Sequence, residues 1–207
     1  MKLFLLRLVT CLFVVSSSSH AALYDRGNGL IYDDVLDITW MQDANALALF
    51  ENYSSSDYKA TSGDAHNLIS DLIYSGYDDW RLPSVGSAPR VGYDQYTGEL
   101  GHMFFHNLGN TTGLDNVSFS DATDGSTMSF LNVQQYAYMY SEYYSGNASL
   151  SWVFNMSDGY QYFDELYYSG NGALWAVRDG DSIPIPATAW LFGSAIAGLL
   201  VANRKRG

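Results

Sequence analysis

Cysteine is almost missing from this chain. The single cysteine among the 207 residues is Cys11, which lies in an apolar stretch near the N-terminus. If that stretch is removed, no thiol remains, and disulfide bonds, zinc–thiolate sites and a cysteine nucleophile are excluded from the rest of the protein. The fold must then be held together by its hydrophobic core and its hydrogen bonds.

Basic side chains are also scarce. The sequence has 10 Lys and Arg residues against 22 Asp and Glu residues, and half of the basic ones lie near the two ends. Residues 22–182 therefore carry 22 acidic side chains against five basic ones, a net charge near −17. Such a surface repels nucleic acid and anionic polymers and favours cations or neutral sugars. We expect no nucleic-acid partner.

The first 21 residues have the layout of a secretory signal. Two basic residues precede an apolar run at residues 8–15, and small residues follow as far as Ala21. We expect cleavage after Ala21 and export of residues 22–182, which are enough for one domain with a sizeable core. A lipoprotein cleavage site at Cys11 is the alternative, although the apolar run continues beyond it.

The last 25 residues, 183–207, predict a membrane-spanning helix. Residues 185–202 contain no charged side chain, and a helix of this length measures roughly 27 Å, close to the thickness of a hydrocarbon layer. The flanking residues suit the two interfaces, with basic side chains on the cytoplasmic side: Pro184, Pro186, Trp190, Arg204, Lys205 and Arg206. The alternative, a core helix of a soluble domain, lacks the polar face that such a helix needs.

This tail resembles the sorting signals of PEP-CTERM proteins, closest to the VPLPA variety. The matching residues are Pro184, Pro186, Ala187, Ala189, Trp190, Leu191, Phe192, Gly193 and Ser194. The resemblance implies recognition by an exosortase-like membrane enzyme in a Gram-negative bacterium. It also implies inner-membrane anchoring, processing near the prolines, and delivery to the cell surface or the outside. Ile183, Ile185 and Thr188 depart from the usual residues.

The hydrophobic pattern predicts an α+β domain. Apolar and aromatic runs predict strands at residues 30–32, 38–41, 136–140, 150–156 and 174–178. Helices are predicted at residues 43–50, 63–74 and 99–108, with Gly76 and Gly109 as stop signals for the second and third. Helices followed by an antiparallel sheet are typical of the α+β class.

The same region resembles the Lcl C-terminal domain family. The motifs that match, in order, are GlyLeuIleTyrAsp (29–33), AspIleThrTrpMetGlnAspAla (37–44), AspAspTrpArgLeuProSer (78–84), GlyGluLeuGlyHis (98–102), SerTrpValPheAsn (151–155), SerAspGlyTyrGln (157–161) and TrpAlaValArgAspGly (175–180). The resemblance covers nearly all of residues 23–181 and implies a C-type-lectin-like fold. Met139 departs from the pattern, because family members usually carry tryptophan there.

The large apolar residues of these motifs read as core positions: Trp80, Leu82, Trp152, Phe154, Trp175 and Val177. Arg81 and Arg178 stand beside them in a chain with few basic residues. We expect them to hold the sheet ends to loops through Asp78, Asp79, Asp179 or Asp181, and ligand clamping is the alternative.

Catalytic signatures are sparse. His102 and His106 have metal-ligand spacing on a helix, but Met103 stands where a HisGluxxHis hydrolase has its glutamate. Paired carboxylates are common, but an acidic surface produces such pairs by chance. We therefore expect no enzyme and no resident cofactor.

Calcium and sugars are the ligands that remain. The loop at residues 115–125 offers oxygen ligands in Asp115, Asn116, Asp121 and Asp124, without EF-hand spacing, so a solvated polar loop is the alternative. Sugars could stack on exposed tyrosines, unless these fill a sheet core: Tyr143, Tyr144, Tyr160, Tyr162, Tyr167 and Tyr168.

Taken together, the residues predict an exported, non-enzymatic component of an envelope or biofilm matrix that binds polysaccharide or a surface protein. Two alternatives stay open. One is a carboxylate-dependent enzyme that acts on extracellular polysaccharide, and the other is a structural coat protein without a ligand.

Overall fold

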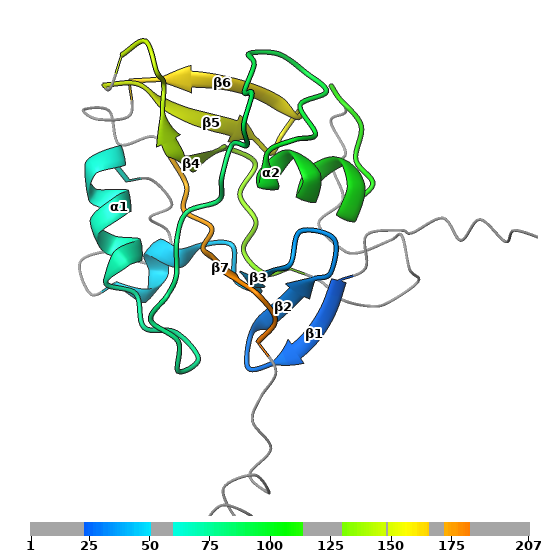
Figure 1. The fold of residues 1–207 in the computed structure, drawn as a ribbon, viewed down its shortest axis with the longest axis vertical. Helices are drawn as coiled ribbons and strands as arrows, with labels where there is room; N and C mark the ends of the chain where they lie inside the picture. The colour runs from blue at the N-terminus through cyan, green and yellow to red at the C-terminus, as the bar shows by residue number, and fades with distance from the viewer. Residues whose placement is uncertain (1–22, 51–59, 114–129, 148, 166–171, 183–207) are drawn as a thin grey trace, which may run out of the picture.

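The structure, a computed structural model, describes residues 23–50, 60–113, 130–147, 149–165 and 172–182 (Figure 1). Its elements are β1 (Leu23–Gly27), β2 (Leu30–Asp33), β3 (Ile38–Met41), the 3-10 helix η1 (Ala46–Leu49), α1 (Ser62–Ser70), α2 (Glu99–His102), the π-helical turn η2 (Met103–Asn107), β4 (Ala137–Tyr143), β5 (Ser151–Asn155), β6 (Tyr160–Asp164) and β7 (Val177–Asp179). The named strands pair antiparallel, which confirms the α+β class.

No helix within these ranges is long and apolar enough to cross a bilayer. The predicted span at residues 185–202 and the predicted signal peptide lie outside the described residues.

The strands form two sheets, with orders β1-β2-β3-β7 and β4-β5-β6. Residues 172–176, which we call the connector, lie between them. The connector residue Ala173 exchanges backbone hydrogen bonds with β4, and Ala176 accepts one from Met41 at the end of β3. The connector then continues into β7, so one short stretch of chain joins the two sheets.

One hydrophobic cluster fills the space between the sheets and helices. The six predicted core residues, Trp80, Leu82, Trp152, Phe154, Trp175 and Val177, are all at most 5% exposed, which confirms that prediction. Trp175 lies near the centre, with ring centroids of Trp40, Phe130 and Tyr138 at 4.8–5.8 Å. Met139 is also buried, so this departure from the motif places a flexible thioether in the core.

The helices differ in extent from their predictions. α1 begins after Thr61, whose hydroxyl accepts a hydrogen bond from the Asp64 amide, and it ends at Ser70 rather than at residue 74. Gly76 does not stop this helix. With a φ of +85° it shapes the following turn, in which Tyr74 and Tyr77 exchange backbone hydrogen bonds. The helix predicted at 43–50 is a single 3-10 turn, η1.

The third predicted helix is found at residues 99–107, although its second half, η2, is π-helical. The strand predicted at 38–41 is found with the same bounds, and those predicted at 30–32, 136–140 and 150–156 are found with shifted ends. Of the strand predicted at 174–178, only residues 177 and 178 lie in a strand, β7. β1 and β6 were not predicted, because their polar and charged residues hide the alternation.

Candidate functional site

Arg81 joins the first sheet to α2. Its guanidinium donates to both carboxylate oxygens of Glu99, each at 2.8 Å, and to Asp179 at 2.6 and 2.9 Å. The hydrogen bonds that Arg81 donates to Glu99 are the main cause of its raised pKa. Asp179 was among the predicted partners, whereas Glu99 was not.

Arg178 is paired in the same manner. Two nitrogens donate to Asp79 at 2.7 and 2.8 Å, and the guanidinium lies 4.0 Å from the ring centroid of Tyr77. These hydrogen bonds lower the pKa of Asp79. Arg26, which the sequence did not single out, makes the corresponding pair with Asp181.

These contacts are the sheet-to-loop ties that the sequence predicted for Arg81 and Arg178, and they leave little of either guanidinium for a ligand. A ligand role for the two arginines stays a prediction.

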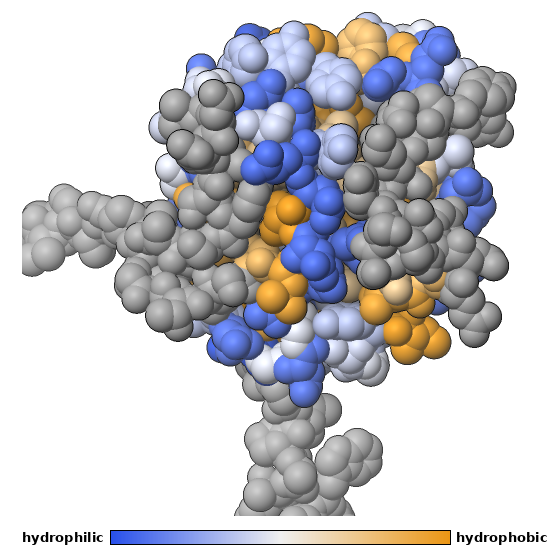
Figure 2. Space-filling view, turned by 180° about the vertical axis from the view of Figure 1, so that it is seen from behind, coloured by the Kyte–Doolittle hydropathy of each residue, from blue (hydrophilic) through white to orange (hydrophobic). Residues whose placement is uncertain are grey.

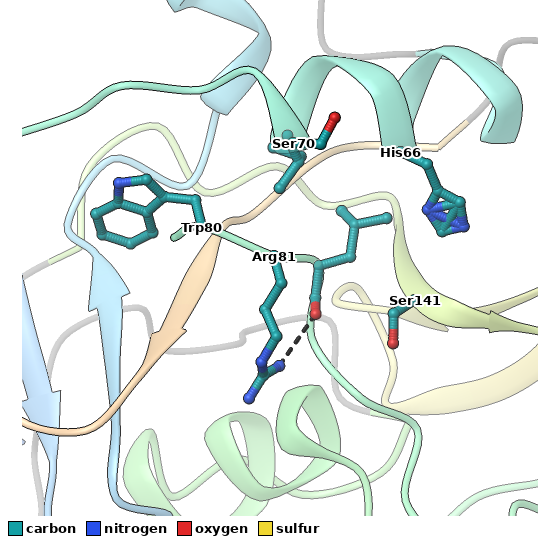
Figure 3. Close-up of a pocket in the computed structure, with 7 residues that line it drawn as sticks. His66, Ser70, Trp80, Arg81 and Ser141 are labelled. Carbon is teal, nitrogen blue, oxygen red and sulfur yellow. Dashed lines mark hydrogen bonds between the residues drawn. The ribbon is translucent and has the colours of Figure 1, made fainter. Parts of the chain in front are cut away.

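A small hollow lies between α1, the Trp80–Leu82 stretch and β4, with a volume of about 160 Å³ (Figure 3). Its lining residues are His66, Ile69, Ser70, Trp80, Arg81, Leu82 and Ser141. Tyr143, another predicted ligand residue, packs its ring at 5.1 Å from His66. Figure 3 shows the Arg81 side chain turned away from His66. Ligand pockets usually measure roughly 300–1,000 Å³, so this hollow could accept only part of a ligand.

A group of tyrosine rings in contact lies along β6. The rings of Tyr93 and Tyr160 meet at 4.8 Å, and those of Tyr160 and Tyr162 at 6.0 Å. Tyr96 follows in the same loop as Tyr93 and packs on Phe105 at 4.7 Å. We call Tyr93, Tyr96, Tyr160 and Tyr162 the tyrosine surface.

The tyrosine surface is open to solvent and uncharged. Tyr93 is 46% exposed and Tyr96 is 44% exposed, while Tyr160 and Tyr162 are half-buried. A hydrogen bond to Asp94 raises the pKa of Tyr96, and burial raises that of Tyr162. The Tyr96 hydroxyl donates its one hydrogen bond to Asp94, at 3.0 Å.

Other exposed apolar side chains are scattered. On the face turned away from Figure 1, the uncovered part shows hydrophilic side chains running between small hydrophobic groups (Figure 2). Single exposed hydrophobic residues are normal and need no partner. The clustering of tyrosines along β6 is therefore the feature that stands out.

The structure separates the tyrosines that the sequence grouped. Tyr160 and Tyr162 lie on the tyrosine surface, although Tyr162 also packs against the core. Tyr144 stacks on Phe163 at 4.1 Å and helps to cover the core, as the alternative expected. Tyr167 and Tyr168 lie outside the described residues. Tyr93 and Tyr96 were missed, although two tyrosines in a Gly- and Asp-containing loop were a usable signal.

The metal predictions have different outcomes. His102 and His106 lie with ring centroids 4.9 Å apart, and burial lowers the pKa of His102. Across the described ranges, no three His, Cys, Asp or Glu side chains are placed to hold a metal ion. The calcium candidates Asp115, Asn116, Asp121 and Asp124 lie outside those ranges, so calcium stays a prediction.

Comparisons with protein-family models, with curated proteins and with solved structures found no match to this chain. The two resemblances carried by the sequence motifs stay predictions.

Proposed function

We propose that this chain is an exported surface protein that binds a neutral polysaccharide without altering it. The observation that carries the proposal is the tyrosine surface. Tyr93, Tyr160 and Tyr162 form a continuous series of ring contacts at 4.8 and 6.0 Å, and Tyr96 adds a ring on the same loop as Tyr93.

A row of tyrosines suits a sugar polymer for a chemical reason. The C–H face of a pyranose ring is apolar and flat, and it stacks on an aromatic ring whose hydroxyl remains free for hydrogen bonding. Successive rings along β6 and the neighbouring loop can meet successive sugars. Each ring has only two side-chain torsions to fix, so little conformational entropy is lost on binding.

Charge favours a neutral polymer over an anionic one. The net charge of residues 22–182 is near −17, and the tyrosine surface has acidic neighbours. Asp94 accepts a hydrogen bond from Tyr96. Burial raises the pKa of Tyr162, and the nearby charges of Asp164 and Asp158 raise it further. Carboxylates accept hydrogen bonds from sugar hydroxyls and repel uronate or sulfate groups.

The C-type-lectin-like fold belongs to the same proposal. The TrpArgLeuPro and TrpAlaValArg motifs lie side by side, because Arg81 and Val177 exchange backbone hydrogen bonds at 2.8 and 2.9 Å. Two motifs of the resemblance thus form one framework near the core. This pairing supports a structural role for the motifs, with the ligand bound elsewhere on the domain.

Binding is tested by replacing Tyr93 and Tyr96 together with alanine in the full chain, purified in mild detergent. We expect the affinity for an uncharged glucan or galactan to fall at least about tenfold, since two exposed stacking contacts are lost. Tyr24→Ala is the matched control, because Tyr24 is similarly exposed, at 42%, on β1. A wild-type chain that binds no neutral glycan contradicts the proposal, and release of reducing ends would favour the enzyme alternative.

Export is tested by deleting residues 183–207 in a Gram-negative host that carries an exosortase. The proposal assigns residues 1–21 to secretion and the tail, with its proline motif and basic cluster, to sorting. We expect the full chain at the cell surface or in the medium and the truncated chain in the periplasm. Full-length protein that remains in the cytosol with residues 1–21 attached would contradict this route.

A further inference from the structure

The loop at residues 84–98 carries half of the tyrosine surface. Its base is closed where the Glu99 amide donates to the Ser84 carbonyl at 2.9 Å. The Glu142 carboxylate also accepts hydrogen bonds from the Ser84 hydroxyl and the Val85 amide. Figure 1 shows the loop rising from the first sheet to β6 and returning to α2. A compact loop with its ends tied together is an Ω-loop, a form that often carries function.

The tip of the loop is held by one residue of β6, Gln161. Backbone hydrogen bonds run in both directions between Gly92 and Gln161, at 2.9 and 3.0 Å. The side-chain amide of Gln161 donates to the Arg90 carbonyl at 3.0 Å and accepts from the Tyr140 hydroxyl at 3.0 Å. Gln161 is 1% exposed, so these bonds are shielded from water.

Gln161 lies between the two halves of the tyrosine surface. Its neighbours in β6 are Tyr160 and Tyr162, which point to the other face of the strand because side chains alternate. Its partner across the backbone bridge is Gly92, and Tyr93 follows directly. The position of Tyr93 against Tyr160 therefore depends on the contact between Gln161 and the loop.

We infer that Gln161 is the positioning residue of the polysaccharide site, which holds the loop tip so that Tyr93 and Tyr160 present one continuous surface. This inference rests on the proposed function. Tyr140 has a supporting part, because its buried hydroxyl donates to the side-chain oxygen of Gln161 at 3.0 Å. The amide nitrogen of Gln161 is thereby left to face the loop.

The test replaces Gln161 with leucine in the full chain, which removes both side-chain hydrogen bonds and no tyrosine. We expect affinity for the neutral glycan to fall about tenfold, the change that corresponds to one net hydrogen bond. Hydrogen exchange at the amides of residues 90–94 should become faster at the same time. Tyr140→Phe leaves Gln161 in place and removes only the hydroxyl, so it tests the same contact with less risk to folding.

Thr39→Val is the matched control, because it removes two buried side-chain hydrogen bonds, one to the Gly180 carbonyl and one from the Ser182 hydroxyl, in the other sheet. Affinity within about twofold of wild type is expected for it, since the Gln161 contacts remain. A wild-type chain that binds no polysaccharide overturns the proposed function and this inference together. A wild type that binds, with Gln161→Leu and Tyr140→Phe variants that bind equally well, overturns the role of Gln161 alone.

Discussion

Replacing Trp175 with alanine is expected to lower the free energy of unfolding by about 3–5 kcal/mol, which is the usual cost of truncating a buried tryptophan. Trp175 has no exposed surface, and its ring contacts those of Trp40, Phe130 and Tyr138. Its indole N–H donates to the Met41 carbonyl at 2.7 Å. The substitution would leave both a cavity and a buried carbonyl without this donor.

Urea unfolding followed by far-ultraviolet circular dichroism would measure this change. Trp175→Phe is the informative companion, because it keeps an aromatic ring and loses the indole donor, and we expect it to cost less than the alanine variant. Leu131→Ala, at a position 49% exposed, should change stability little. A loss below about 1 kcal/mol for Trp175→Ala would show that the core closes around the gap.

Replacing Arg81 with methionine is expected to lower the free energy of unfolding by roughly 2–4 kcal/mol. The Glu99 side chain is only 14% exposed, and without Arg81 its carboxylate would lose two hydrogen bonds and its compensating charge. The pair with Asp179 contributes less, because the Asp179 side chain is 79% exposed and water screens it.

Two further variants separate these contributions. Asp179→Asn should cost under about 1 kcal/mol, as for an exposed ion pair. Adding Glu99→Gln to Arg81→Met should recover part of the loss, because the uncompensated buried charge is then gone. If Asp179→Asn and Arg81→Met lower the free energy of unfolding equally, Arg81 stabilises the fold through its exposed pair with Asp179 and not through Glu99.

Elements specified by neighbouring residues could be predicted from the sequence. The β2–β3 hairpin lies within residues 30–41, and its apolar strands and Asp-rich turn are all visible there. α1 shows its spacing over two turns, and Thr61 provides a capping oxygen. Asp79, the partner of Arg178, and Asp179, a partner of Arg81, were both among the predicted carboxylates. These predictions were possible because the chain has few basic side chains with which its carboxylates can pair.

Features that depend on distant segments could not be predicted in this way. β6 begins TyrGlnTyr, and its inward residue is the polar Gln161. Burial of that amide is acceptable only because Tyr140 and the Arg90 carbonyl satisfy it, and both come from other parts of the chain. The tyrosine surface has the same origin, since Tyr93 and Tyr160 meet through that contact.

The connector at residues 172–176 has a consequence for how the protein reaches its native state. It is among the last parts of the domain to be synthesised, yet it supplies backbone partners to β3 and β4 and leads into the edge strand β7. The N-terminal strands leave the ribosome or a translocation channel first, so their pairing with the connector and β7 waits until residues 172–179 have emerged. This pairing joins segments far apart in the sequence, and such long-range pairing is intrinsically slow.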